Sequence, residues 1–223
     1  RADDQTGEAT DIVVTGSRIR RANNEANPVT AIGQAEFQEK GLSASEDLLR
    51  ALPINSGSVN SPDTTGSPYT VGTAQFNLRG LGLASTLTLI NGRRQVVSPI
   101  PNDDGSSFVD INTIPLIMVE RLEVLQDGAA ALYGSDAVAG VANFIMRTKM
   151  DGVEMRGGFQ TTTTNRQEDY TLGIVGGTRL GNWDVVAGVE YIKRTPLAMV
   201  DRPFTNGKIR SALGFPGAFA PTG

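Results

Sequence analysis

Three segments in the second half of the chain alternate strictly between apolar and polar positions. They cover residues 153–161, 170–176 and 183–192, and the third carries an aromatic residue near either end, Trp183 and Tyr191. Successive side chains of a β-strand point to opposite faces, so this period predicts strands with one apolar face. Strands of about ten residues are longer than the average strand of a soluble sheet. The pattern favours transmembrane barrel strands whose apolar face meets lipid, and a meander packed on a soluble core is the alternative.

Three strands cannot close a barrel, and an open sheet edge is not stable in lipid. We therefore expect these strands to belong to a larger assembly. The apolar face of the third strand is expected to face lipid or detergent, through Trp183, Val185, Val189 and Tyr191.

Residues 29–149 contain short apolar runs separated by turn signals, which predict a small mixed sheet with short helices. Helices are predicted at 34–40, from a capping-box pattern at 43–46 to Pro53, and at 129–133, with a helical turn within 110–118. Asn91-Gly92 is a strong hairpin signal. The last apolar run, residues 138–147, is the most continuous, so we expect it to form a central strand of the sheet. Strands are predicted at 29–32, 76–79, 86–90, 94–97, 119–125 and 138–147.

Composition excludes several classes of function. Lys+Arg 20 and Asp+Glu 24 give a net charge of −4 without a basic block, which argues against a nucleic-acid partner. The absence of His and Cys excludes disulfides, thiolate or imidazole metal sites and His-dependent triads in these residues. No apolar run is long enough for a transmembrane helix. The first residues, RADD, carry no hydrophobic signal segment, so we expect any secretory signal to have been removed.

Motifs that suggest chemistry are incomplete. Residues 79–82 lack both a G-x-G-x-x-G pattern and a G-K-[ST] ending, and residues 102–105 do not fit an EF-hand loop. Glu120 and Glu123 are three apart on a predicted strand and point to opposite faces, so they are not a carboxylate pair. We expect no enzyme activity, no cofactor and no metal, while a looser oxygen site remains open at Asp103, Asp104 and Asp110.

Taken together, five motifs resemble the plug domain of TonB-dependent outer-membrane receptors, and the likeness runs from residue 11 to 149. The motifs are FNLRGLG (76–82), LINGRR (89–94), DINTIP (110–115), VERLEVL (119–125) and ALYGSDAVAGVANFI (131–145). The strands that follow resemble the first strands of the barrel. The resemblance implies an α+β plug domain followed by antiparallel transmembrane strands, as a fragment of a 22-stranded plugged barrel.

The implied domain organisation has four parts. Residues 1–28 form a mobile N-terminal segment, 29–149 the plug, 150–193 the first three barrel strands and 194–223 a truncated extracellular loop. Residues 11–16 (DIVVTG) resemble the Ton box, although their pattern alone favours an edge strand of the domain's own sheet. The resemblance implies that the periplasmic domain of TonB binds Asp11, Ile12, Val13, Val14 and Thr15.

The resemblance also implies two groups of contact residues. Substrate contacts lie in two apical loops, 55–73 and 97–108, and we expect them at Tyr69, Asn102, Asp103 and Asp104. Contacts between plug and barrel are expected at Arg79 of the family's Arg-Gly motif, and at Arg93, Glu120, Arg121 and Glu123. The sequence departs from the family at residues 126–128, where Gln-Asp-Gly replaces the Arg-Gly-Pro of many members, so the resemblance does not extend to one of the usual cationic contacts between plug and barrel.

The implied function is uptake of a scarce or bulky nutrient across a Gram-negative outer membrane, energised by the proton gradient through TonB and gated by the plug. The N-terminus would be periplasmic and the plug would lie in the barrel lumen. Further partners would be outer-membrane lipid, the rest of the barrel on the same or a separate chain, and the substrate. The motif style favours an oligosaccharide, peptide or other organic nutrient over a ferric chelate. A stand-alone periplasmic binding or signalling module without a barrel is the alternative.

Overall fold

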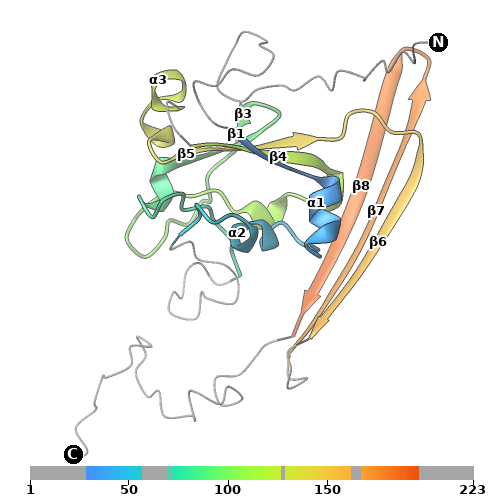
Figure 1. The fold of residues 1–223 in the computed structure, drawn as a ribbon, viewed down its shortest axis with the longest axis horizontal. Coiled ribbons are helices and arrows are strands. Elements are labelled where there is room, and N and C mark those ends of the chain that lie inside the picture. The colour runs from blue at the N-terminus through green and yellow to red at the C-terminus, as the bar shows by residue number, and fades with distance from the viewer. Residues whose placement is uncertain (1–28, 57–69, 71, 127–128, 162–166, 196–223) are drawn as a thin grey trace, which may run out of the picture.

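The computed structural model describes residues 29–56, 70, 72–126, 129–161 and 167–195. They form two β-sheets: a five-stranded sheet in an N-terminal domain, and a three-stranded sheet that runs along one side of it (Figure 1). None of the helices in these described ranges is both long and apolar enough to cross a membrane.

The five-stranded sheet is mixed and has the order β1-β4-β5-β2-β3. β5 is parallel to β2 and antiparallel to β4, so it lies in the middle, as its apolar sequence predicts. β1 pairs with β4 and forms one edge. The strands are β1 (Val29–Gly33), β2 (Thr86–Ile90), β3 (Arg93–Arg94), β4 (Val119–Leu125) and β5 (Gly140–Met146).

Short helices and turns connect these strands. The mixed α+β character predicted from the sequence is confirmed. The elements are α1 (Gln34–Glu39), α2 (Asp47–Ala51), α3 (Ala129–Tyr133) and the 3₁₀ turns η2 (Leu83–Ser85), η3 (Ile111–Thr113), η4 (Leu116–Met118) and η5 (Ser135–Ala137).

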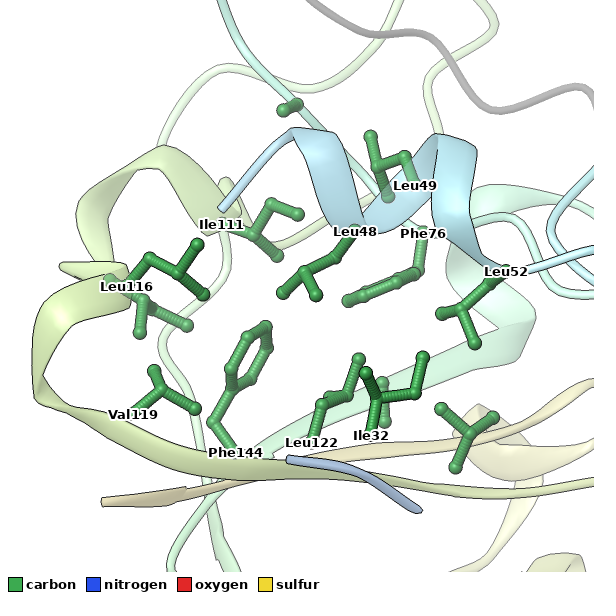
Figure 2. Close-up of a cluster of buried hydrophobic side chains, with 14 of the residues drawn as sticks. Ile32, Leu48, Leu49, Leu52, Phe76, Ile111, Leu116, Val119, Leu122 and Phe144 are labelled. Atoms are coloured by element: carbon green, nitrogen blue, oxygen red, sulfur yellow. The ribbon is translucent and has the colours of Figure 1, made fainter. Parts of the chain in front are cut away.

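Apolar side chains cover both faces of the sheet. On one face, Leu48 and Leu49 of α2 lie over Leu122 and Phe144 of the sheet, and Phe76 fills the space between them (Figure 2). A smaller cluster on the other face lies beneath α3. Its buried members are Leu87, Leu89, Leu125, Ala129, Ala137 and Val141. These two clusters hold β4 and β5 from both sides, which makes that pair the centre of the domain.

The second sheet, called the wall sheet below, consists of β6 (Gly152–Thr161), β7 (Glu168–Leu180) and β8 (Trp183–Arg194). All its pairings are antiparallel and follow one another without a register shift. The apolar positions point away from the N-terminal domain, and Trp183 and Val189 are 77% and 65% exposed. On the opposite face, Thr171 and Val175 are buried against the domain. The predicted alternation is therefore confirmed, with its apolar side outward.

Two strand predictions are wrong. Residues 76–79 form no strand; a single bridge joins Leu78 to Asn55, because side chains of Asn55 and Thr86 occupy the backbone amides that a ladder would use. The strand after the Asn91-Gly92 turn is limited to Arg93–Arg94, so the predicted run 94–97 is not a strand.

The predicted capping box at 43–46 is also wrong, because the carboxylate that caps the helix belongs to Asp47 and not to Glu46. Oδ2 of Asp47, not the side chain of Glu46, accepts the backbone N–H groups of Ser43 and Ala44, both at 2.9 Å. Glu46 occupies the N-cap position of α2 without a side-chain capping bond. Its carboxylate is therefore available for a contact outside the helix.

Candidate functional site

The candidate site is the interface between the N-terminal domain and the inward face of the wall sheet. Amphipathic strands normally present apolar side chains to the core they cover. Here most inward positions instead carry charged, amide, hydroxyl or glycine residues, and the apolar exceptions are Val175, Val186 and Ile192. The others include Glu154, Arg156, Gly158, Gln160, Asp169, Thr171, Gly173, Gly177, Gly188, Glu190 and Arg194.

A chain of polar contacts crosses this interface at β6. Arg147, just after β5, donates to Glu154 with an Nη1–Oε2 distance of 2.6 Å. Arg156 lies 3.3 Å from the other oxygen of Glu154 and donates to Oε1 of Gln34 at 2.6 Å. Gln34 in turn donates to the carbonyl oxygen of Val119. This chain joins α1, β4 and the end of β5 to the first wall strand.

A second contact lies near the other end of the strands. Arg194 of β8 pairs with Glu46 and also donates through Nε to Oδ2 of Asp169 at 2.8 Å. The Glu46 side chain is only 6% exposed, so its charge needs a close partner of opposite sign, and Arg194 provides it. Nearby, Gln160 donates to Oγ of Ser43 at 3.0 Å.

Close packing of the turn η4 on two wall glycines marks the third part of the interface. Glu190 of β8 accepts the backbone N–H of Ile117 through Oε2 at 3.0 Å. A Cβ built on Gly173 would lie 2.9 Å from Cδ1 of Ile117, and one built on Gly188 would lie 2.8 Å from Cγ of Met118. Glycine at these two wall positions is therefore what allows the turn to sit directly on the sheet.

A groove of about 580 Å³ lies between α1 and β6. Its lining includes residues 41–43, Phe37 of α1 and Phe159 of β6. β6 is an edge strand of the wall sheet, so one wall of the groove carries unpaired backbone groups on the side away from β7.

The predicted plug–barrel residues fall into two groups in the structure. Glu120, Arg121 and Glu123 are brought together on β4: Arg121 donates to Glu120 at 2.8 Å and to Glu123 at 2.9 Å. Arg79 has a positive φ of 58° and donates to the carbonyl oxygens of Ala139 and Val138. Arg93 is exposed in the short hairpin strand. None of the contacts described for these five residues is to the three wall strands, so their contacts to a barrel stay a prediction.

The predicted substrate residues lie in one described loop. Backbone bonds from Gly105 to Asn102 and from Asn102 to Ser106 close a turn at residues 102–106. Asp104 is exposed, and the hydrogen bonds from the side chain and backbone of Ser106 hold the pKa of its carboxyl below the ordinary value. Tyr69 and the predicted TonB-binding residues 11–15 lie outside the described residues.

Among the three carboxylates of the oxygen site that the sequence leaves open, Asp103, Asp104 and Asp110, the last already has backbone partners. Its Oδ1 accepts the backbone N–H groups of Ala74 and Asn112, so it caps η3. The described part of the chain contains no group of three His, Cys, Asp or Glu residues placed to hold a metal ion.

Sequence reasoning missed most of the interface residues that the structure shows. Gln34 belongs to no motif, and the sequence pattern assigns Ser43 and Glu46 to a capping box rather than to an interface. Glu154, Arg156, Gln160 and Glu190 could have been found, because they occupy the polar face of the alternating segments. A charged residue on the face opposite lipid needs a polar partner inside, which is a usable signal.

The five-stranded domain packs on the polar face of amphipathic strands whose apolar face points outward. This arrangement defines the class of protein: a plug with the first strands of a surrounding wall. The family model for the TonB-dependent receptor plug domain matches residues 21–141. The chain belongs to this family, which is one of transport receptors. The resemblance noted from the five motifs is thereby confirmed.

Relatives and solved structures agree with this assignment. An iron-regulated outer membrane virulence protein of Vibrio cholerae serotype O1 is 30% identical over 166 residues, which is 73% of this chain and 23% of the relative. The chain thus spans about a quarter of that relative's length. The fold is similar to the siderophore receptor PirA of Acinetobacter baumannii (TM-score 0.58, 24% identity, 74% of this chain and 24% of that one). It is also similar to the ferric enterobactin receptor PfeA of Pseudomonas aeruginosa (TM-score 0.56, 22% identity, 73% and 24%).

Proposed function

We propose that the chain is the plug and the first three wall strands of a receptor for TonB-dependent nutrient uptake across the outer membrane. The observation that carries the proposal is the inverted polarity of the wall sheet. Its exposed face is apolar, with Trp183, Val189 and Tyr191 among the exposed side chains, and its polar face meets the plug. A membrane barrel needs this arrangement because lipid surrounds it and the plug fills its lumen.

The same polarity argues against a stand-alone periplasmic module. Such a module would have no reason to expose an apolar sheet face with an unpaired strand at each edge. In the proposed receptor, further barrel strands pair with these edges. The proposal keeps the four-part organisation 1–28, 29–149, 150–193 and 194–223, with a periplasmic N-terminus and the plug in the barrel lumen.

Energy would enter through residues 11–15. A β-prone pentapeptide that adds to a sheet edge of TonB binds mainly through backbone hydrogen bonds. The plug then contributes a gate rather than chemistry: tension on the N-terminal end would reach β1, which is an edge strand held by β4 on one side only.

For the substrate, the relatives support a ferric chelate as the first candidate. The Vibrio cholerae relative is described as iron-regulated, and the similar structures are described as receptors for siderophores or ferric enterobactin. The motif style of the sequence favours an organic nutrient instead. The turn at residues 102–106 would contribute Asn102, Asp103 and Asp104 to the substrate surface, together with Tyr69.

Uptake by cells tests this proposal. The complete receptor is expressed in a Gram-negative strain that lacks its own siderophore receptors, and accumulation of radioactive iron from a panel of ferric siderophores is measured. We expect uptake of at least one chelate, and its loss when a protonophore collapses the proton gradient. Uptake that continues unchanged with the protonophore would contradict TonB-dependent transport.

If no ferric chelate is taken up, the same cells are given labelled oligosaccharides and peptides. Uptake of one of these would replace the ferric chelate as substrate and retain the transport mechanism. Failure with every class would contradict the proposed function.

A further inference from the structure

We propose that Glu190, Gly173 and Gly188 form a permanent seat for the plug turn η4 on the barrel wall, and that Glu190 is the positioning residue of this seat. The proposal rests on the proposed function, since it assigns a stationary junction within the transporting receptor. The seat is defined by these three wall residues and by Leu116, Ile117 and Met118 of the turn.

The turn requires an external acceptor, and Glu190 supplies one. The first N–H groups of a 3₁₀ turn have no partner within the turn itself. Pro115 at the N-cap has no N–H, so the amides that need an acceptor are those of the turn itself. Ile117 is fully buried, so its amide would lose water without gaining a bond if Glu190 were absent. The Oε2 of Glu190 accepts this amide at 3.0 Å.

The glycines provide a flat surface on either side of that hydrogen bond. The side chain of Ile117 lies so close to Gly173 that an added Cβ would be 3.3 Å from its Cβ and 2.9 Å from its Cδ1. Met118 lies in the same way over Gly188, 2.8 Å from an added Cβ. A charged hydrogen bond, flanked by two close contacts between side chains of the turn and glycines of the wall, fixes both the distance and the orientation of the turn.

On its other side the turn is continuous with the plug core. Leu116 points into the core beside Val119 and Phe144, whereas its neighbour Ile117 contacts the wall (Figure 2). Met118 accepts the backbone N–H of Arg147 at 2.9 Å, just beyond β5. The seat therefore attaches the central strands β4 and β5, rather than the edge strand β1, to the wall.

The burial of the seat indicates that it is kept during uptake. Its acceptor and its donor are both half-buried or buried, so separating them would leave an uncompensated charge and a buried amide. Near α1, by comparison, the hydrogen bond from Gln160 to Ser43 lies at the surface, while the Glu46–Arg194 pair beside α2 is largely buried. We infer that η4 stays on β7 and β8 while the receptor works.

Hydrogen exchange in the complete, detergent-solubilised receptor tests the role of Glu190 without any transport assay. In Glu190→Ala the amide of Ile117 should exchange roughly tenfold faster, because it loses a charge-assisted hydrogen bond. Glu190→Gln retains an acceptor oxygen and should restore most of the protection. Asp184→Ala is the matched control, since Asp184 lies on the same strand and pairs with Arg179 of the wall. Equal exchange in wild type and Glu190→Ala would overturn the proposal.

A disulfide then tests whether the seat is stationary. Ile117→Cys with Gly173→Cys places two Cβ atoms close to disulfide distance and removes the isoleucine branches that would clash. The 223 residues contain no Cys, so no native thiol of this part competes. We expect the oxidised receptor to take up its substrate within about twofold of the reduced receptor. Uptake that is lost on oxidation and regained on reduction would show that the turn must leave the wall, and would overturn the proposal.

The two tests separate the seat from the proposed function. The single variants Ile117→Cys and Gly173→Cys control for the oxidant, since neither can form the bond. If the reduced double variant and the wild type both fail to take up any substrate, the proposed function fails, while the exchange of the Ile117 amide still decides whether Glu190 positions the turn.

Discussion

Replacing Phe144 by alanine is expected to destabilise the plug by about 3–5 kcal/mol. Phe144 is fully buried in the middle strand β5, and its ring lies 6.1 Å from that of Phe76 (centroid to centroid). Truncation would remove this packing and leave a cavity between the sheet and α2, which the rigid strands cannot close. The free energy of opening of the β4 and β5 amides, measured by hydrogen exchange in the detergent-solubilised receptor, reports the loss.

Phe159 is the matched control for this change. It has the same side chain on wall strand β6, but it is 58% exposed and contacts chiefly the ring of Tyr170, at 5.1 Å. Phe159→Ala should cost only about 1 kcal/mol. Equal effects of the two truncations would contradict the position of the core between β5 and α2.

The second large effect is expected at Glu123. Glu123→Ala should lower stability by about 3–5 kcal/mol, because it removes one partner of a buried ion pair. Glu123 is 1% exposed and accepts Nε of Arg121 at 2.9 Å. Nη2 of Arg121 is already buried without a hydrogen-bond partner among the described residues. Loss of Glu123 would therefore leave the guanidinium still less compensated.

Glu120 offers a control that shares the same arginine. It binds Nη1 of Arg121 at 2.8 Å, but half of its side chain is exposed, so solvent screens the pair. Glu120→Ala should cost about 0–1 kcal/mol by the same exchange measurement. A loss at Glu120 as large as that at Glu123 would show that burial does not distinguish the two carboxylates.

The strand pattern of this protein could be predicted from local sequence wherever one face of a strand has a distinct environment. The alternation around Val189 and the hairpin signal Asn91-Gly92 are of this kind, because each depends only on residues close in the chain. The motif resemblance supplied the plug assignment, since ALYGSDAVAGVANFI is long and specific.

Predictions failed where distant residues determine the local structure. The run at 76–79 alternates apolar and polar residues and suits a strand, yet the side chains of Asn55 and Thr86 accept hydrogen bonds from its amides. At the start of α2, either of two neighbouring carboxylates, Glu46 or Asp47, could cap the helix. Arg194, far along the chain, pairs with Glu46, and Asp47 becomes the cap.

The interface with the wall was the least predictable part for the same reason. Polar residues at Glu154, Arg156 and Glu190 show that the inward face needs partners, but not which ones. Their partners Arg147, Gln34 and the amide of Ile117 are set by how the two sheets lie together, which only the structure shows.

The most direct test of TonB-dependent transport is calorimetric titration of the complete receptor with a TonB periplasmic domain. We expect the wild type to bind and Val13→Pro to lose binding, because proline removes a backbone N–H that strand addition would use. Glu8→Pro, which lies outside residues 11–15, should bind like the wild type. Equal binding by Val13→Pro and the wild type, or no binding by either, would contradict coupling to TonB through this segment.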